Sequence, residues 1–259
     1  MKTWKRWSRQ EISLLRRNYP HMTINELANK LGRSYSSVAS KIFELGLRKP
    51  WRLNTWEYKE MNKELAYVLG VYFGDGSIRF DTRTRTYHFR LEVKDLDFAL
   101  ATKKALEKLG LRTSLRKTRR GLYLVICCSK SFTQWLRGIK VEELPKLIQN
   151  KEDKISFIRG FFDSDGSLEK NGKGGKYIKM FNKNKELLQV IKRMLEELGF
   201  HPRLRKERYL YVLGIYRNEE ICRFVEIIGS SIPRKRSLFH QNALWKLLHR
   251  VQREAKVRR

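Results

Sequence analysis

Two stretches of this chain carry apolar residues at helical spacing, and each leads to an aspartate followed by glycine. The first reaches Asp75 and Gly76, and the second reaches Asp165 and Gly166. A 3.6-residue period is typical of a helix with a buried face, and glycine is a common helix terminator. The pattern predicts two apolar helices that end at these glycines, with the periodic residues Leu65, Val68, Leu69 and Tyr72 in one and Ile155, Ile158, Phe161 and Phe162 in the other.

Alternating polar and apolar residues follow each predicted helix. Residues 87–94 would place His88, Arg90, Glu92 and Lys94 on one face and apolar or aromatic residues on the other, which predicts a half-buried strand. Residues 111–115 repeat this alternation and lead through a basic turn at 117–121 into an apolar strand at 122–126. Residues 201–205, 206–208 and 209–215 form the matching series in the second part of the chain.

The first 47 residues predict three short helices. Ser8 with Glu11, and Thr23 with Glu26, have the spacing of capping boxes, and Gly32 falls at a helix end, as does Gly46. The expected small core is Leu27, Leu31, Val38, Ile42 and Leu45. The third helix would begin with a polar and basic cluster made of Arg33, Tyr35, Ser36, Ser37, Ser40 and Lys41.

This segment resembles a helix-turn-helix module of the homeodomain or Myb type. In such modules the last helix enters the major groove of DNA, so the polar cluster is expected to contact DNA. A three-helix module that packs against protein remains the alternative.

The two predicted apolar helices belong to a longer internal repeat. Residues 69–77 (LGVYFGDGS) and 159–167 (RGFFDSDGS) place the two aspartates 90 positions apart. LEKLGL at 106–111 is echoed by LEELGF at 195–200, at a separation of 89. Such self-similarity indicates two related half-domains that can pair about a pseudo-two-fold axis and bring the aspartates together.

Small residues recur four positions apart on each predicted helix, at Gly70 and Gly74 and again at Gly160 and Ser164. Small side chains on one face let two helices approach closely. The two C-terminal helix ends would then meet, and their dipoles would add to the negative field of the two carboxylates. Oxygen ligands in such a field suit Mg²⁺.

The charge of the chain indicates a polyanionic partner. It has 57 Lys and Arg against 27 Asp and Glu, for a formal net charge of +30. No stretch approaches the roughly 18 apolar residues of a spanning helix, and the N-terminus has no signal-peptide core, so membrane binding is disfavoured. The three cysteines, Cys127, Cys128 and Cys222, lack CxxC spacing, which argues against a zinc or disulfide framework.

The repeated motif resembles that of the LAGLIDADG homing endonucleases in their single-chain, two-motif form. The resemblance covers residues 62–236. It implies an α+β fold of two pseudo-symmetric αββαββα half-domains that form a saddle over DNA, here preceded by the three-helix module. The motifs depart from the family pattern at Val68, Phe73, Arg159 and Phe161. Asp163, the counterpart of Phe73, is expected to be a local cap or a solvent contact.

The resemblance also implies the catalytic centre. Asp75 and Asp165 would bind the metal, with Gly74 and Ser164 as neighbouring metal-site residues. Water would attack one phosphate in each DNA strand while nearby basic residues stabilise the developing charge.

Further catalytic residues follow from the same resemblance. A polar residue at the end of the second strand of each half would orient water, and the nearest matches are Asp95 and Asn184. A lysine near the end of the fourth strand is matched by Lys130, with Arg217 as the better partner in the second half. This asymmetry predicts that one DNA strand is cut faster.

Half-exposed strands that carry Arg and Lys are suited to base edges and phosphates in a major groove. The residues expected to contact DNA from these strands are Arg79, Arg90, Lys94, Arg112, Arg116, Lys179, Arg203 and Arg205.

The expected domain order has five parts: the module at 1–47, a connector at 48–61, half-domains at 62–150 and 151–236, and a basic helix or tail at 237–259. The connector contains Pro50, Trp51, Arg52 and Trp56. It would form either an extended arm along DNA or a linker whose tryptophans dock onto the second domain.

The combined expectation is a monomeric, Mg²⁺-dependent enzyme that makes a double-strand break at one long asymmetric DNA site. An intracellular location in the cytoplasm or nucleoid is expected, with an organelle also open, and an intein origin is disfavoured because the termini lack splice-junction residues. Two alternatives remain: an intron RNA maturase, and a catalytically inactive DNA-binding regulator.

Overall fold

The computed structural model describes residues 6–19, 22–47, 56–82, 86–170 and 176–236. The chain divides into two compact units, Met1–Leu53 and Asn54–Arg259, and each has its own hydrophobic core. The expected arm through Pro50, Trp51 and Arg52, and the expected helix or tail at 237–259, lie outside the described residues.

The first unit consists of three short helices, as the sequence predicts. They are α1 (Arg9–Asn18), α2 (Ile24–Leu31) and α3 (Tyr35–Glu44). Both predicted capping boxes form, and the left-handed conformation of Gly32 ends α2. The predicted apolar positions are buried or packed against the core, which Leu15 and Ala28 complete.

The second unit contains two copies of one αββαββα series. In the first copy these are α4 (Lys63–Phe73), β1 (Ser77–Asp81), β2 (Thr86–Val93), α5 (Leu96–Lys108), β3 (Thr113–Lys117), β4 (Tyr123–Cys127) and α6 (Lys130–Gly138). A 3₁₀ turn (Val141–Glu143) and α7 (Leu144–Leu147) join the copies. The second copy is α8 (Lys151–Asp165), β5 (Gly166–Lys170), β6 (Lys176–Asn182), α9 (Lys185–Glu197), β7 (Arg203–Glu207), β8 (Leu210–Ile215) and α10 (Asn218–Ile227). The expected α+β architecture is confirmed, and no described helix could cross a membrane.

Each copy forms a four-stranded antiparallel sheet with the same strand order, β1-β2-β4-β3 in one and β5-β6-β8-β7 in the other. Phe89 lies opposite Cys127 in the first sheet, and Ile178 lies opposite Ile215 in the second. These four side chains are fully buried, because one face of each sheet packs against the shared core. The opposite face carries most of the polar and charged positions.

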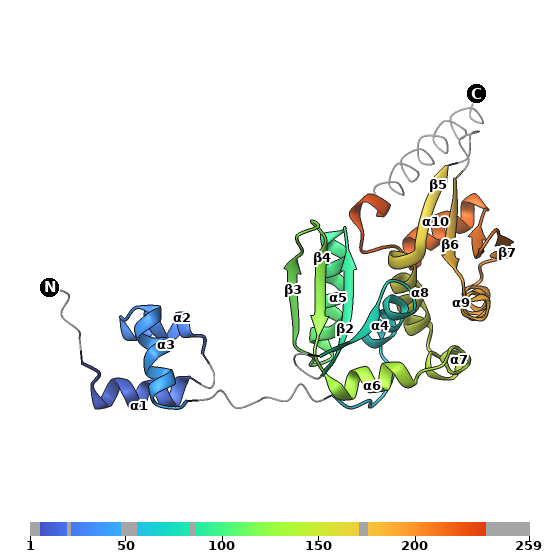
Figure 1. Cartoon of the computed structure of the whole chain (residues 1–259). Coiled ribbons are helices and arrows are strands. Elements are labelled where there is room, and N and C mark those ends of the chain that lie inside the picture. Colours follow the sequence, from blue (N-terminus) through green and yellow to red (C-terminus); the bar gives the residue numbers. More distant parts are fainter. Residues whose placement is uncertain (1–5, 20–21, 48–55, 83–85, 171–175, 237–259) are drawn as a thin grey trace, which may run out of the picture. The chain divides into compact units, whose positions relative to one another are not determined.

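The helices α4 and α8 pack side by side between the two sheets (Figure 1). Their contact is made by backbone: a Cβ added to Gly70 would lie 2.1 Å from the Phe157 carbonyl oxygen, and one added to Gly160 would lie 2.2 Å from that of Tyr67. Only glycine allows this approach. The predicted role of the small residues as a helix–helix contact is therefore confirmed.

The end of the connector docks onto the second unit. The Trp56 ring lies 5.0 Å from the Phe132 ring and 5.0 Å from the Trp135 ring, and the Trp56 amide donates to Ser131 Oγ at 2.9 Å. The docking alternative is thus correct for Trp56.

Candidate active site

The paired helices deliver the two motif aspartates to one place. The second helix runs through Asp165 and ends at Gly166, as predicted, but the first stops at Phe73 and leaves helical geometry at Gly74. Gly74 packs so closely on the opposite helix that an added Cβ would lie 2.3 Å from Ser164 Cβ. Gly74 and Ser164 are therefore the steric contact that brings the residues after them together.

The electrostatics of the pair suit a cation. Burial, together with the negative charge of Asp75, raises the pKa of Asp165 to about 6, against opposing effects of Asn182 and Lys235. Burial of the carboxyl group also raises the pKa of Asp75, although the residue as a whole is exposed. Two carboxylates that repel each other in a partly dehydrated site gain from a divalent ion with oxygen preference. The donor set therefore fits a hard cation such as Mg²⁺.

Lys235 lies beside this pair, although it was not among the residues predicted from the sequence. Its side chain is 4% exposed and donates to the carbonyl oxygens of Phe162 at 2.6 Å and Asp163 at 3.0 Å. Burial lowers its pKa to about 8, while the charges of Asp163, Asp95 and Asp75 act in the opposite direction. In the sequence, Lys235 is one of three consecutive basic residues and carries no distinguishing signal.

The water-orienting candidates occupy different positions from those expected. Asn184 caps α9 by accepting a hydrogen bond from the Leu187 amide at 3.0 Å. It is Asn182, two residues earlier at the end of β6, whose amide donates to Asp165 Oδ2 at 3.0 Å. Asp95 stands before α5 and forms an ion pair with Arg234 at 3.2 Å. The asparagine that contacts the carboxylate is therefore Asn182, two residues before the expected Asn184.

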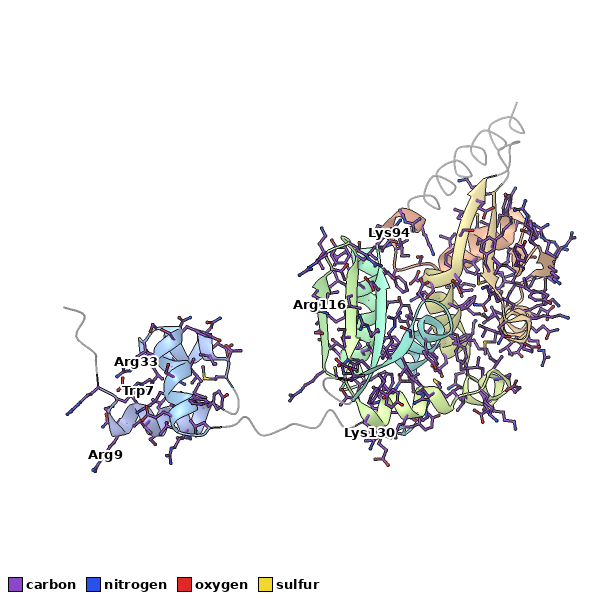
Figure 2. The ribbon with its side chains drawn as sticks, in the orientation of Figure 1. Trp7, Arg9, Arg33, Lys94, Arg116 and Lys130 are labelled. Atoms are coloured by element: carbon purple, nitrogen blue, oxygen red, sulfur yellow. The ribbon has the colours of Figure 1, made fainter. Side chains whose placement is uncertain are left out.

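Lys130 follows the end of β4, as expected, but it does not lie at the end of the sheet where Asp75 is found. Ser77 pairs with Arg90, so Asp75 lies toward the end of β2 that leads to Lys94. Lys130 begins α6, beyond the end of β4, whereas Lys94 follows the end of the antiparallel neighbour β2. The two lysines consequently lie at opposite ends of the first sheet (Figure 2). The lysine whose charge lowers the pKa of both aspartates is Lys235.

The counterpart of Lys130 in the second half-domain is not Arg217, as the strand register shows. Phe89 pairs with Cys127 in the first sheet as Ile178 pairs with Ile215 in the second. Each residue of β4 therefore corresponds to the residue 88 positions later, in β8. The counterpart of Lys130 is therefore Asn218, the first residue of α10. Arg217 instead lies 3.3 Å from Glu220 as an ion pair.

The prediction for Asp163 was wrong, because this residue is 2% exposed and lies in the interior. Its carboxylate accepts hydrogen bonds from Tyr67 Oη, from the hydroxyls of Ser230 and Ser231, and from the Ser231 amide. An acceptor-only side chain surrounded by donors is stable in the interior.

In the first unit, Arg33 holds the fold together and is not displayed toward a ligand. Its guanidinium makes two hydrogen bonds to Glu11, at 2.9 and 3.0 Å, and lies over the Trp7 ring at 4.2 Å (Figure 2). Only 5% of the side chain is exposed, which corrects the expectation of DNA contact. Lys41 is similarly engaged, with Glu44 at 2.6 Å.

The other residues of the predicted cluster lie at the start of α3. Tyr35 is 55% exposed, Ser36 is exposed and Ser37 is half-buried. On the same helix, Phe43 is 90% exposed and was not among the residues predicted to contact DNA.

The outer face of the first sheet is basic. Arg79 pairs with His88 across the strands, Arg90 with Ser77, and Arg116 with Leu124, which places these arginines on the face opposite the core. Arg79 and Arg116 are exposed, as are Lys94 and Arg112, while Arg90 is half-buried. Figure 2 shows Arg116 on the outer strand.

The outer face of the second sheet contains cations that are paired with acids. Lys179 lies 3.2 Å from Glu169 and stacks over the Tyr177 ring at 4.9 Å. Arg205 pairs with Glu207, and Arg203 is exposed on the same strand. The outer face of the first sheet thus carries exposed arginines, whereas cations on the equivalent face of the second sheet form ion pairs with glutamates.

Comparison with known proteins agrees with this architecture. Residues 62–140 and 152–229 match the LAGLIDADG-like domain. An uncharacterized protein of Methanocaldococcus jannaschii is 35% identical over 194 residues, which cover 67% of this chain and 69% of that protein.

Two solved structures share the fold at low sequence identity. The homing endonuclease I-DmoI of Desulfurococcus mucosus, in complex with DNA and Mn, is 23% identical, with a TM-score of 0.51 over 64% of this chain and 96% of that one. Full-length DUF199/WhiA from Thermatoga maritima is 16% identical, with a TM-score of 0.51 over 77% of this chain and 69% of that one. The chain therefore belongs to the LAGLIDADG-like domain family and carries two copies of the domain in one polypeptide.

Proposed function

We propose that this protein is a divalent-metal-dependent endonuclease that hydrolyses both strands of a long, asymmetric DNA site. The observation that carries the proposal is the carboxylate pair Asp75 and Asp165, placed together by backbone-to-backbone helix packing and flanked by the buried Lys235.

The residues of the site have distinct tasks in this reaction. Asp75 and Asp165 would hold Mg²⁺ or a similar ion, with Gly74 and Ser164 beside them. The ion would supply positive charge at the scissile phosphates and a favourable position for water. Asn182 orients the Asp165 carboxylate through its hydrogen bond and so fixes the direction of that ligand.

Lys235 would stabilise the charge that develops on the phosphate. Its ammonium group has three donors, and two of them are held by carbonyl oxygens among the described residues. The third would donate to a phosphate oxygen of bound DNA. A preorganised cation in a partly dehydrated site stabilises a transition state more than one in water does, because it needs no reorganisation.

The DNA would lie across the outer faces of the two sheets. Arg79, Arg90 and Arg116 on the first sheet can reach phosphates and guanine edges, and Lys94 and Arg112 add to the positive surface there. Lys179, Arg203 and Arg205 have the same place on the second sheet. Because both half-domains are present in one chain, a monomer would recognise a site without two-fold symmetry.

The first unit would provide a further DNA contact through α3. Its exposed residues Tyr35, Ser36 and Phe43 are the candidates, since Arg33 and Lys41 are engaged within the unit. Deletion of residues 1–47 should then shorten the footprint on DNA and weaken binding.

The proposal is tested by cleavage of a DNA library in Mg²⁺ with the wild type and with the Asp75→Asn/Asp165→Asn variant. The wild type should cut a single site, and the variant should bind the same site in Ca²⁺ without cutting in Mg²⁺. Asp153→Asn is the matched control, because Asp153 is also buried on α8 but lies at its other end.

Other outcomes would identify a different function. Specific binding by the wild type without any cutting would contradict the nuclease and favour a DNA-binding regulator, in line with the shared fold of WhiA, a probable cell division protein in Leuconostoc citreum. Absence of both would direct the search to folded intron RNA and a splicing assay.

A further inference from the structure

We propose that Asp163 is a positioning residue: it fastens the segment Ser230–Arg236 beneath the carboxylate pair and so holds the Lys235 ammonium group in the site. This inference rests on the proposed endonuclease function, because it concerns the assembly of that active site. It assigns a task to a motif residue that the metal site itself does not use.

The segment Ser230–Arg236, here called the crossing segment, follows α10 and connects the two half-domains. It turns back at Gly229, whose left-handed φ of 63° lets the chain reverse after α10. Ser230 and Ser231 bind Asp163 on α8, and Arg234 binds Asp95 in the first half-domain. Its interior side chains, Ser230, Ile232 and Lys235, are 8%, 1% and 4% exposed.

Asp163 is the centre of this attachment. Its Oδ1 accepts from Ser230 Oγ at 2.5 Å and from the Ser231 amide at 3.1 Å, and its Oδ2 accepts from Ser231 Oγ at 2.6 Å and from Tyr67 Oη at 2.9 Å. One backbone N–H and three hydroxyls thus converge on one buried carboxylate. Such charge-assisted hydrogen bonds are about twice as strong as neutral ones, so the segment is held firmly.

The same residue also sets the position of Lys235. The backbone oxygens of Phe162 and Asp163, at the C-terminal end of α8, accept from the ammonium group. These carbonyls lie at the negative end of the helix dipole, which favours a cation. The side chain of Asp163 binds Ser230 and Ser231, and its backbone carbonyl accepts a hydrogen bond from Lys235. One residue therefore holds both the start of the crossing segment and its lysine.

The sequence repeat indicates that this device belongs to one half only. The counterpart of Asp163 is Phe73, which cannot accept a hydrogen bond. The offset of 88 that relates β4 to β8, continued along the chain, pairs Lys235 with Leu147, the uncharged last residue of α7. Among the described residues, Lys235 thus has no lysine counterpart in the first half-domain, and its charge acts on both carboxylates.

The first test measures the position of Lys235 without reference to catalysis. Competitive acetylation of lysines, read by mass spectrometry on the full chain, should find Lys235 protected in the wild type. Protection should be lost in Asp163→Asn, in which an amide N–H₂ group faces the donors of Ser231, and retained in Asp153→Asn. Unchanged protection in a folded Asp163→Asn would overturn the proposal, whether or not the protein cuts DNA.

The second test asks whether Asp163 acts through Lys235. Asp163→Asn should lower the single-turnover cleavage rate about 10- to 100-fold, the range for groups that orient a functional side chain, with little change in DNA affinity in Ca²⁺. In a Lys235→Met background the same substitution should have no further effect. Full additivity of the two losses would show that Asp163 acts independently of the lysine, and the proposal would be wrong.

A second variant covers the case in which Asp163→Asn does not fold. Ser231→Ala removes one hydroxyl donor to Asp163 and leaves the backbone N–H in place. It should give a smaller gain in Lys235 acetylation and a smaller loss of rate. If the wild type cuts no DNA at all, the endonuclease function fails, and the acetylation result still decides the role of Asp163.

Discussion

The helix–helix contact between α4 and α8 gives the sharpest prediction, the effect of Gly160→Ala. The added Cβ would lie 2.2 Å from the Tyr67 carbonyl oxygen and 3.1 Å from the Val71 amide nitrogen, whereas Cβ atoms essentially never come within 3.0 Å of another atom. Both neighbours are helix backbone and cannot rotate away. The helices would have to separate by about 1 Å, a gap large enough to forfeit a quarter to a half of each dispersion contact across it.

The size of the effect follows from two opposing contributions. Overpacking of a filled interior costs about 1–3 kcal/mol, and the rigid neighbours here place Gly160→Ala at the upper end. Replacing glycine by alanine in a helix returns roughly 0.5–1 kcal/mol. The net loss should be about 2 kcal/mol, or a fall of about 4–8 °C in Tm for a domain of this size.

Denaturant and thermal unfolding, followed by circular dichroism, measure this loss. Gly138→Ala is the matched control, because Gly138 ends α6 and has no atom within 4 Å of an added Cβ. It should leave stability unchanged or raise it by up to about 1 kcal/mol. Equal stability of the Gly160→Ala and Gly138→Ala proteins would refute the close backbone contact.

The same perturbation has a consequence for the active site. Asp165 is the last residue of α8 and Asp75 lies two residues after α4, so a separation of the helices by about 1 Å displaces the aspartates by a similar distance. Misplacement on that scale can cost about 100-fold in rate. Gly160→Ala should therefore lower DNA cleavage even under conditions in which the protein is folded, and normal cleavage would show that the helix spacing does not set the site.

Three further predictions concern charge. Because the pKa of Asp165 is raised from 3.8 to about 6, its ionisation destabilises the fold as the pH rises from about 4 to about 6. Asp165→Asn should therefore stabilise the metal-free protein at pH 7.5 by about 1–3 kcal/mol, after allowance for partial solvent exposure. Ca²⁺ should raise the Tm of the wild type at pH 7.5 but not at pH 5, where Asp165 is protonated. Arg33→Ala should destabilise the first unit, which would be seen as faster proteolysis within it. The difference in stability between wild type and variant should shrink as the pH falls from about 4.5 toward 2, because the hydrogen bond from Arg33 is the main cause that lowers the pKa of Glu11 to about 2. Asn182→Ala removes a hydrogen bond that lowers the pKa of Asp165, so the pH of half-maximal cleavage should move upward, and an unchanged pH profile on a plasmid substrate would exclude this role.

Local pattern explains why so much of the fold could be predicted. Apolar period, capping boxes and small-residue spacing are properties of neighbouring residues, and they predicted the three helices of the first unit and the two motif helices. The repeat then predicted that Asp75 and Asp165 meet, because two similar half-domains pair about a pseudo-two-fold axis. The early end of α4 at Phe73 was missed, since it depends on the contact between Gly74 and Ser164 across the interface.

The polar residues show which features the sequence determines and which depend on tertiary contacts. The sequence by itself determined the repeat, the aspartate pair and the excess of positive charge, because these need only residue type and spacing. Tertiary structure decided that Asp163 is buried, that Arg33 pairs with Glu11, and that Lys235 lies beside the two carboxylates. A charged residue looks the same in sequence whether water or a buried partner surrounds it, and the partners of Asp163 and Lys235 come from segments about 70 residues away. Only the folded chain brings those segments together.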